Sequence, residues 1–163
     1  MTPGAPNRAV LDLTGHLMHA GHVLNTRLSA ALAEAGLSQR EQCVLVHALE
    51  GERTQIQLAE LAHLDKTTMV ATVDRLESAG LAERRQSAAD RRARIIHVTP
   101  AGREAAERGQ VIVDRVHQEA LGAVPEDRRE VFLDVLRGLA ESALAQPDPA
   151  ATGVRRARGP RAR

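Results

Sequence analysis

Apolar residues recur at helical spacing along most of the chain, whereas β-branched residues gather in one short segment. Met69, Val73 and Leu76 stand at i, i+4 and i+7, so they share one face of a helix and are expected to be buried. The β-branched segment, residues 94–99, follows this helix after a glycine and a run of basic residues. The pattern predicts two short helices joined by a tight turn and followed by a basic β-hairpin, which is typical of DNA-binding proteins.

Helix-capping residues mark where the two short helices begin. Thr54 and Gln57 form a capping box, since the threonine hydroxyl can accept from the third helical amide while Gln57 reaches back to the cap. Asp65 is placed to cap the second helix, which we expect to span residues 65–79 and to stop at Gly80. The residues expected to form the apolar face of the first helix are Leu58, Leu61 and Ala62.

The opposite face of the second helix carries short hydroxyls, a methyl group and one long cation. Such a face lets a helix approach base edges and phosphates closely, which bulky or acidic side chains would prevent. We therefore interpret the second helix as a recognition helix, with an ordinary amphipathic helix and its solvated polar face as the alternative. The residues of this face are Thr67, Thr68, Ala71, Thr72 and Arg75.

The basic hairpin is predicted to have strands at residues 81–86 and 94–99. Arg91 and Arg92 lie near its tip, where an arginine can enter a narrow minor groove of strongly negative potential. Asp90 is expected to pair with a neighbouring arginine and to hold the loop in shape. The alternative is a solvated charged hairpin, in which an isolated surface ion pair contributes less than ~1 kcal/mol.

Two runs of sequence closely resemble the signature of the multiple-antibiotic-resistance-regulator (MarR) family. They are residues 74–84, with a Leu-Glu-x-x-Gly-Leu helix exit, and residues 90–102, with an Asp-x-Arg wing and a closing Thr-x-x-Gly. The resemblance extends over residues 11–144 and is densest at residues 58–102. The chain departs from the family pattern at Val98, where the family has leucine, and valine preserves the apolar contact.

The resemblance implies a mainly α-helical protein with a winged helix-turn-helix, whose two copies form an obligate dimer that regulates transcription. By the same resemblance, Asp90 and Arg92 correspond to the aspartate and arginine of the Asp-x-Arg signature. We expect sequence-specific binding to double-stranded DNA at an inverted repeat, because twofold protein symmetry must be mirrored in the DNA, and we expect repression of transcription. The candidate DNA-binding residues are Thr54, Gln55, Lys66, Thr67, Thr68, Ala71, Thr72, Arg75, Arg84, Arg85, Asp90, Arg91, Arg92 and Arg94.

The long terminal helices carry more apolar surface than a compact winged-helix lobe can cover. Exposed stripes of this extent usually mark an interface, so we expect the helices to interlace in a homodimer, with a monomeric bundle as the alternative. The predicted organisation is a disordered start at residues 1–9, a MarR-like domain at residues 10–145 and a disordered arginine-rich tail at residues 146–163. Within the domain, residues 10–36 and 100–145 form the dimerisation helices, and residues 37–99 form the winged-helix lobe.

The charge distribution restricts how DNA binding could work. The formal net charge is only +1, and the tail from Gln146 holds five arginines and one aspartate, which leaves −3 for residues 1–145. Affinity for DNA therefore cannot rest on global charge. It must depend on cations placed locally in the wing and around the recognition helix, and doubled by dimer symmetry.

Composition excludes several other classes of protein. A single cysteine rules out an internal disulfide, and no apolar run approaches the ~20 residues of a transmembrane helix, so we expect a cytoplasmic protein without a membrane partner. The sequence shows no nucleophile elbow, phosphate-binding glycine loop or metal-ligand cluster, so we expect neither an enzyme nor a cofactor. The remaining alternatives are a helical protein-interaction module that docks an acidic partner and a non-specific architectural DNA-binding protein.

Histidine and cysteine residues raise the question of a sensing role. His16 and His19 could share a helix face and bind a metal, but no carboxylate or thiol lies at matching spacing, so we expect histidines that line a dimer cleft and no metal. Cys43 could be a reactive thiol, yet a small, half-buried structural cysteine is favoured, beside an unusual Gln42 where the family tends to have an apolar or aromatic residue. The family resemblance implies a small anionic or phenolic effector in the cleft between the dimer helices and the DNA-binding lobe, and its binding residues are unknown.

Overall fold

The computed structural model describes residues 12–87 and 94–145, and it divides into two compact units, residues 1–120 and 121–163. The predicted disordered start, the wing-tip residues Asp90, Arg91 and Arg92, and the predicted tail at residues 146–163 lie outside the described residues.

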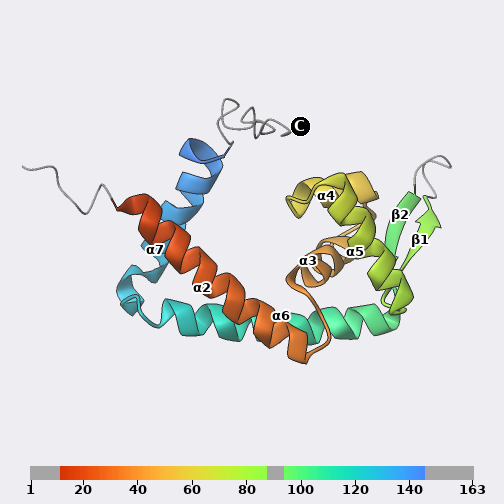
Figure 1. The fold of residues 1–163 in the computed structure, drawn as a ribbon, viewed down its shortest axis with the longest axis horizontal. Helices are drawn as coiled ribbons and strands as arrows, with labels where there is room; N and C mark the ends of the chain where they lie inside the picture. The colour runs from red at the N-terminus through yellow and green to blue at the C-terminus, as the bar shows by residue number, and fades with distance from the viewer. Residues whose placement is uncertain (1–11, 88–93, 146–163) are drawn as a thin grey trace, which may run out of the picture. The chain divides into compact units, whose positions relative to one another are not determined.

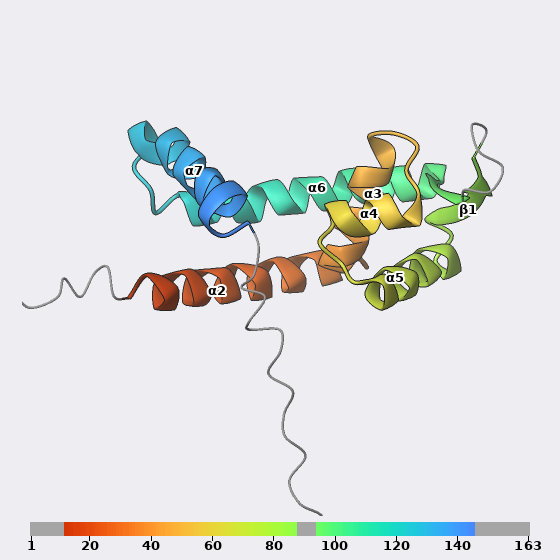
Figure 2. The same cartoon turned by 90° about the horizontal axis from the view of Figure 1, so that it is seen from above.

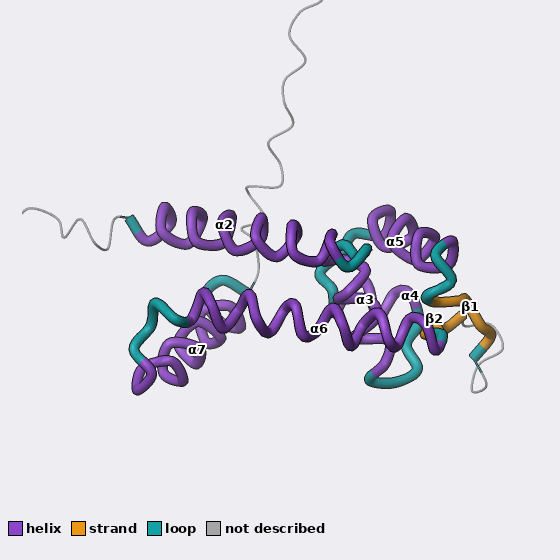
Figure 3. Tube along the Cα trace, turned by 90° about the horizontal axis from the view of Figure 1, so that it is seen from below, coloured by secondary structure: helices purple, strands orange, loops and turns teal. Residues whose placement is uncertain are grey.

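Within the described residues, the first unit is built almost entirely from helices, and its strands form one hairpin (Figure 1, Figure 3). This confirms the predicted fold class, a mainly helical winged helix-turn-helix with a small wing. Figure 2 shows α3, α4, α5 and the hairpin gathered at the N-terminal end of α6. The elements are α2 (Leu13–Glu34), α3 (Gln39–Leu49), α4 (Gln55–Leu61), α5 (Lys66–Ser78), β1 (Ala82–Gln86), β2 (Arg94–Val98) and α6 (Pro100–Leu121).

The helices begin where their capping residues predict. The capping box of Thr54 and Gln57 is complete at the start of α4, and Asp65 Oδ1 accepts from the Thr68 amide at 2.9 Å at the start of α5. The helix α5 ends at Ser78, two residues before Gly80, whose φ of +70° is a conformation that glycine adopts without strain. Hydrogen bonds between residues close in sequence therefore determine where α4 and α5 begin.

The wing is an antiparallel hairpin whose register pairs Ala82 with Val98 and Gln86 with Arg94. Its inner edge is joined to the start of the helix-turn-helix, because the Ile96 amide donates to the Arg53 carbonyl at 3.1 Å and Thr54 forms a bridge with Ile95. The predicted strands are therefore confirmed to within one residue at each outer end. The added bridge ties the hairpin to the residue that caps α4.

The core of the first unit lies between α3, α4, α5, the hairpin and the first half of α6. Met69, Val73 and Leu76 are buried in it, as predicted. The prediction for Leu61 is wrong, since this side chain is 42% exposed. The buried stripe of α4 runs through Leu58 and its neighbours Ala59 and Ala62, so it passes beside Leu61 in a helix of only seven residues. No helix of the described chain combines the length and the apolar character needed to cross a membrane.

A close backbone contact joins α6 to the hairpin. A single residue, Thr99, separates β2 from α6, and its hydroxyl donates to the Gly80 carbonyl at 2.8 Å while accepting from the Gly102 amide at 3.0 Å. A Cβ atom on Gly102 would lie 1.9 Å from the Leu81 carbonyl oxygen, so only glycine fits here. The wing and α6 therefore meet in a joint without free space.

The second unit consists of a 3₁₀ turn (η1, Glu126–Arg128), α7 (Arg129–Gly138) and a π-helical end (η2, Leu139–Ala143). Pro125 is the N-cap residue of the 3₁₀ turn. Several large apolar side chains of α7 stay exposed within the chain, as do Leu13 and Leu17 of α2. Those of α7 are Val131, Phe132, Leu133, Val135 and Leu136.

Candidate nucleic-acid interface

The helix α5 presents a face of small and polar side chains to solvent. Lys66, Thr67, Ala71 and Arg75 are exposed on it. Thr68 is half-buried, and its hydroxyl donates to Asp65 Oδ2 at 2.6 Å. This bond and the Thr68 amide hold the pKa of Asp65 below its ordinary value, so the cap stays charged.

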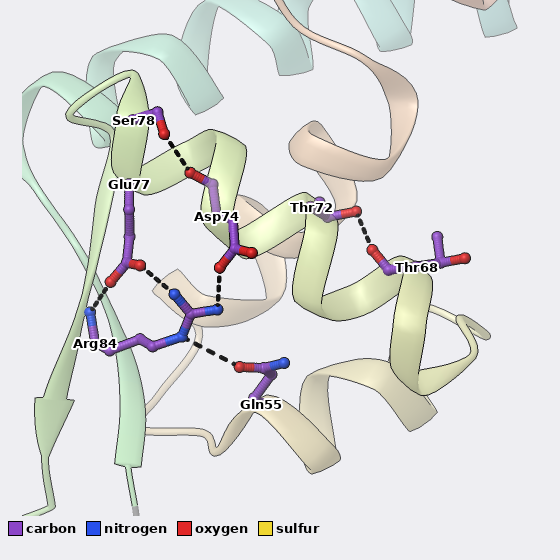
Figure 4. Close-up of polar contacts among 7 residues, drawn as sticks. All are labelled: Gln55, Thr68, Thr72, Asp74, Glu77, Ser78 and Arg84. Atoms are coloured by element: carbon purple, nitrogen blue, oxygen red, sulfur yellow. Dashed lines mark hydrogen bonds and ion pairs between the residues drawn. The ribbon is translucent and has the colours of Figure 1, made fainter.

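Thr72 does not belong to this exposed face. Its side chain is only 6% exposed, and its hydroxyl donates to the Thr68 carbonyl at 2.8 Å (Figure 4). The prediction that Thr72 lies on the outer face of the helix is therefore wrong, because the hydroxyl turns back onto the preceding turn of its own helix. It adjoins the exposed surface only at the edge of a hollow beside α3.

Val70 lies on the exposed face of α5, although the predicted DNA-binding residues do not include it. It is 37% exposed on α5, between Thr67 and Ala71. An exposed methyl-bearing side chain on such a face can contact the methyl group of thymine. The helical spacing of Val70 from Thr67, three residues earlier, is the signal that could have identified it.

Arg84 is engaged entirely within the protein. Its Nε donates to Gln55 Oε1 at 3.3 Å and its Nη2 to Asp74 Oδ1 at 2.7 Å, while Nη1 pairs with Glu77 (Figure 4). The Arg84 amide also donates to Glu77 Oε1 at 2.7 Å. The Arg84 side chain, which belongs to the wing, thus contacts one residue of α4 and two residues of α5. Arg84 and Gln55, both predicted to bind DNA, are brought together, and the guanidinium acts as a clamp between the wing and the helix pair.

We expect Arg84→Ala to lower the free energy of unfolding by about 1–2 kcal/mol, because it leaves two carboxylates and an amide without their charged donor. Urea denaturation followed by circular dichroism would measure the change. Arg85→Ala is the matched control, since Arg85 is more exposed and, among the described residues, pairs with Glu83 of its own strand. The control should change stability by less than about 0.5 kcal/mol, and equal losses in both variants would contradict the clamp.

Four of the predicted residues surround one hollow of about 660 Å³, which is lined mainly by apolar groups. The exposed Ile56 also lies in it. Arg85 lies outside this group, on β1. Asp90, Arg91 and Arg92 lie outside the described residues, so their roles stay predictions. The four residues brought together here are Thr54, Gln55, Lys66 and Arg94.

A second hollow, of about 440 Å³, lies between α5 and the first turn of α3. Arg75 crosses it, with its Nε 3.1 Å from Glu41 Oε1. Glu41 is buried, and its other oxygen accepts from the Ser38 amide at 2.7 Å in a capping box. The ion pair fixes the outer face of α5 to α3.

A third cavity, of about 280 Å³, lies between α2, α3 and α6. Cys43 lines it and is half-buried, as predicted, and burial and then the charge of Glu50 raise the pKa of its thiol. Gln42 also lines the cavity, and its amide nitrogen donates to the Ala106 carbonyl at 2.9 Å. None of the described residues around this cavity is a lysine or an arginine. Among the described residues no group of three or more metal-ligating side chains comes together.

Known proteins share both the sequence pattern and the fold. Residues 35–93 match the sequence model of the MarR family. CouR from Rhodococcus jostii RHA1, solved with p-coumaroyl-CoA, is 30% identical with a TM-score of 0.71, over 79% of this chain and 92% of that chain. A MarR-family transcriptional regulator from Rhodococcus sp. RHA1 is 28% identical with a TM-score of 0.70, over 84% and 96%. The transcriptional repressor CouR on a 23-mer DNA duplex is 25% identical with a TM-score of 0.74, over 83% and 97%.

Proposed function

The chain belongs to the MarR family of transcriptional regulators, and from this premise we propose that it is a homodimeric repressor that binds an inverted DNA repeat and releases it when a small molecule binds. The observation that carries the proposal is the exposed face of α5, where Thr67, Val70 and Ala71 leave the helix narrow enough to enter a major groove. Lys66 at the start of this face supplies charge for the phosphates, whereas Arg75 is paired with Glu41. The similar structure of CouR on a DNA duplex supports the assignment.

The dimer is proposed from the apolar side chains that the described chain leaves exposed. Among the described residues, Leu13 and Leu17 of α2 and Phe132, Val135 and Leu136 of α7 are left largely exposed to solvent. Exposed apolar side chains that repeat along a helix usually become part of an interface between subunits. The proposed organisation keeps residues 10–36 and 100–145 as dimerisation helices and residues 37–99 as the DNA-binding lobe.

We place the effector in the cavity between α2, α3 and α6, where it would touch the long helices and the DNA-binding lobe together. The lining includes Leu28, Leu32 and Val113, with His47 and Gln110 as polar groups. Because no lysine or arginine lines it, this cavity favours a phenolic ligand over an anionic one. A CouR structure bound to p-coumaroyl-CoA supports ligand binding in a related protein.

Selection of binding sites from random duplex DNA tests the proposal. We expect an inverted repeat with half-sites about one helical turn apart, because the recognition helices of a dimer enter successive major grooves on one side of the DNA. If each subunit neutralises about four phosphates, the slope of log affinity against log salt should be near −7.

Two outcomes would favour the alternatives. Equal affinity for the selected and the scrambled duplex would indicate an architectural DNA-binding protein. No binding to any duplex, with retention of an acidic protein partner at low salt, would indicate a protein-interaction module.

A further inference from the structure

The hollow between α3 and α5 is lined by residues of two different helices. One wall is the outer face of α5, since Thr67, Thr68, Ala71 and Arg75 all line it. The other wall is the first turn of α3, which contributes Arg40. A side chain from outside the helix-turn-helix therefore borders the same surface as the residues proposed to read DNA.

The charge at this hollow is not balanced. Arg40 is exposed, and its guanidinium has no hydrogen-bond or ion-pair partner among the described residues. The nearest carboxylate that lines the hollow, Glu41, is already used by Arg75 and by the Ser38 amide. No acidic residue stands three or four positions from Arg40 along α3.

The position of Arg40 does not stabilise α3. It is the second residue of α3, and a cation in the first turn of a helix faces the positive end of the helix dipole. Gln39, beside it, attaches α3 to α2 through bonds to the Asn25 carbonyl at 2.7 Å and the Ser29 hydroxyl at 3.1 Å. The first turn of α3 is therefore held in place by Gln39, whereas the exposed Arg40 contributes no contact to it.

We propose that the hollow seats one sugar-phosphate strand at the edge of the major groove that α5 enters, and that Arg40 binds its phosphate. The proposal rests on the proposed function, since it requires α5 to lie in the groove. Arg40 acts as a charge from a neighbouring helix, so it adds affinity without reading sequence. It extends the interface from the helix-turn-helix and wing to α3, which the sequence analysis did not include.

The experiment compares duplex binding by the full chain with that of Arg40→Ala, Arg40→Lys and Arg108→Ala. Arg108, an exposed arginine of α6 outside the hollow, is the matched control for loss of one charge. We expect Arg40→Ala to weaken binding to the selected operator and to random duplex by the same factor, about 10-fold at low salt, and to make the salt slope shallower by about 2 per dimer. Arg40→Lys should restore most of the affinity, and Arg108→Ala should behave as the unaltered protein.

Three outcomes would overturn the inference. They are unchanged affinity and slope in Arg40→Ala, an equal loss in Arg108→Ala, or a changed consensus, which would mean that Arg40 reads bases. Competition with inorganic phosphate at constant ionic strength distinguishes a site for free phosphate from a site for the DNA backbone. Inorganic phosphate would displace the duplex only from a site that binds free phosphate. Circular dichroism confirms that each variant is folded. If the unaltered protein selects no operator, the proposed function fails, whereas an operator bound equally well by Arg40→Ala refutes only this inference.

Discussion

Gly102→Ala is expected to lower the free energy of unfolding by about 3 kcal/mol or more. The added Cβ would lie 1.9 Å from the Leu81 carbonyl oxygen, and 2.8 Å from both the Leu81 carbonyl carbon and Val98 Cγ1. Two of these atoms belong to the backbone, so no side-chain rotation relieves the overlap. The hairpin would have to separate from α6, which also breaks the bonds of Thr99. Urea or thermal unfolding would measure the loss.

Gly51→Ala is the control for this prediction. No atom lies within 4 Å of a Cβ built on Gly51, so the same chemical change should alter stability by less than about 0.5 kcal/mol. A Gly102→Ala protein as stable as the control would show that the joint between wing and α6 is looser than the structure indicates.

Leu136→Asp is expected to convert the proposed dimer to a monomer and to reduce operator affinity more than 100-fold. Leu136 lies in the exposed apolar row of α7, and an unpaired carboxylate buried in an interface costs several kcal/mol. A monomer contacts only one half-site, so it loses half of the phosphate and base contacts. Sedimentation velocity and DNA titration on the same sample would follow both changes.

Leu136→Met keeps the volume and the apolar character of the side chain, so it should preserve both the dimer and the affinity. The two variants separate loss of the interface from general sensitivity of this helix. A dimeric Leu136→Asp protein with normal affinity would exclude α7 from the interface.

The parts of the fold that depend on local chemistry could be predicted from the sequence. The caps at Thr54 and Asp65 and the glycine stop at Gly80 involve residues within a few positions of each other. A short stretch of sequence therefore shows both partners of each hydrogen bond. The buried face of α5 could be predicted for a similar reason, since three large apolar residues at helical spacing leave one face to bury.

The predictions were wrong where contacts with other elements determine whether a side chain is buried. Leu61 and Thr72 stand at the borders of helix faces, and only the neighbouring elements determine on which side a border falls. The charge of Arg84 predicts a DNA contact, whereas the carboxylates that it pairs with in the folded chain are visible only in the structure. Those partners, Asp74 and Glu77, stand one helical turn apart, which is a weak signal for a carboxylate pair that receives one arginine. The phosphate role of Arg40 depends on a hollow between helices that are distant in sequence.

The joint at Thr99 gives α6 the mechanical character of a lever. The helix has 22 residues and begins directly at the wing, so it reaches about 33 Å from that joint. Without slack at Gly102, the wing and the start of α6 must turn together, and a rotation of about 5° there moves the far end of such a helix by about 3 Å. That displacement is close to the 3.4 Å rise of one base pair. In the proposed dimer, a rotation of α6 and the wing together by this angle would therefore move each recognition helix relative to the far end of α6 by a distance close to one base-pair step.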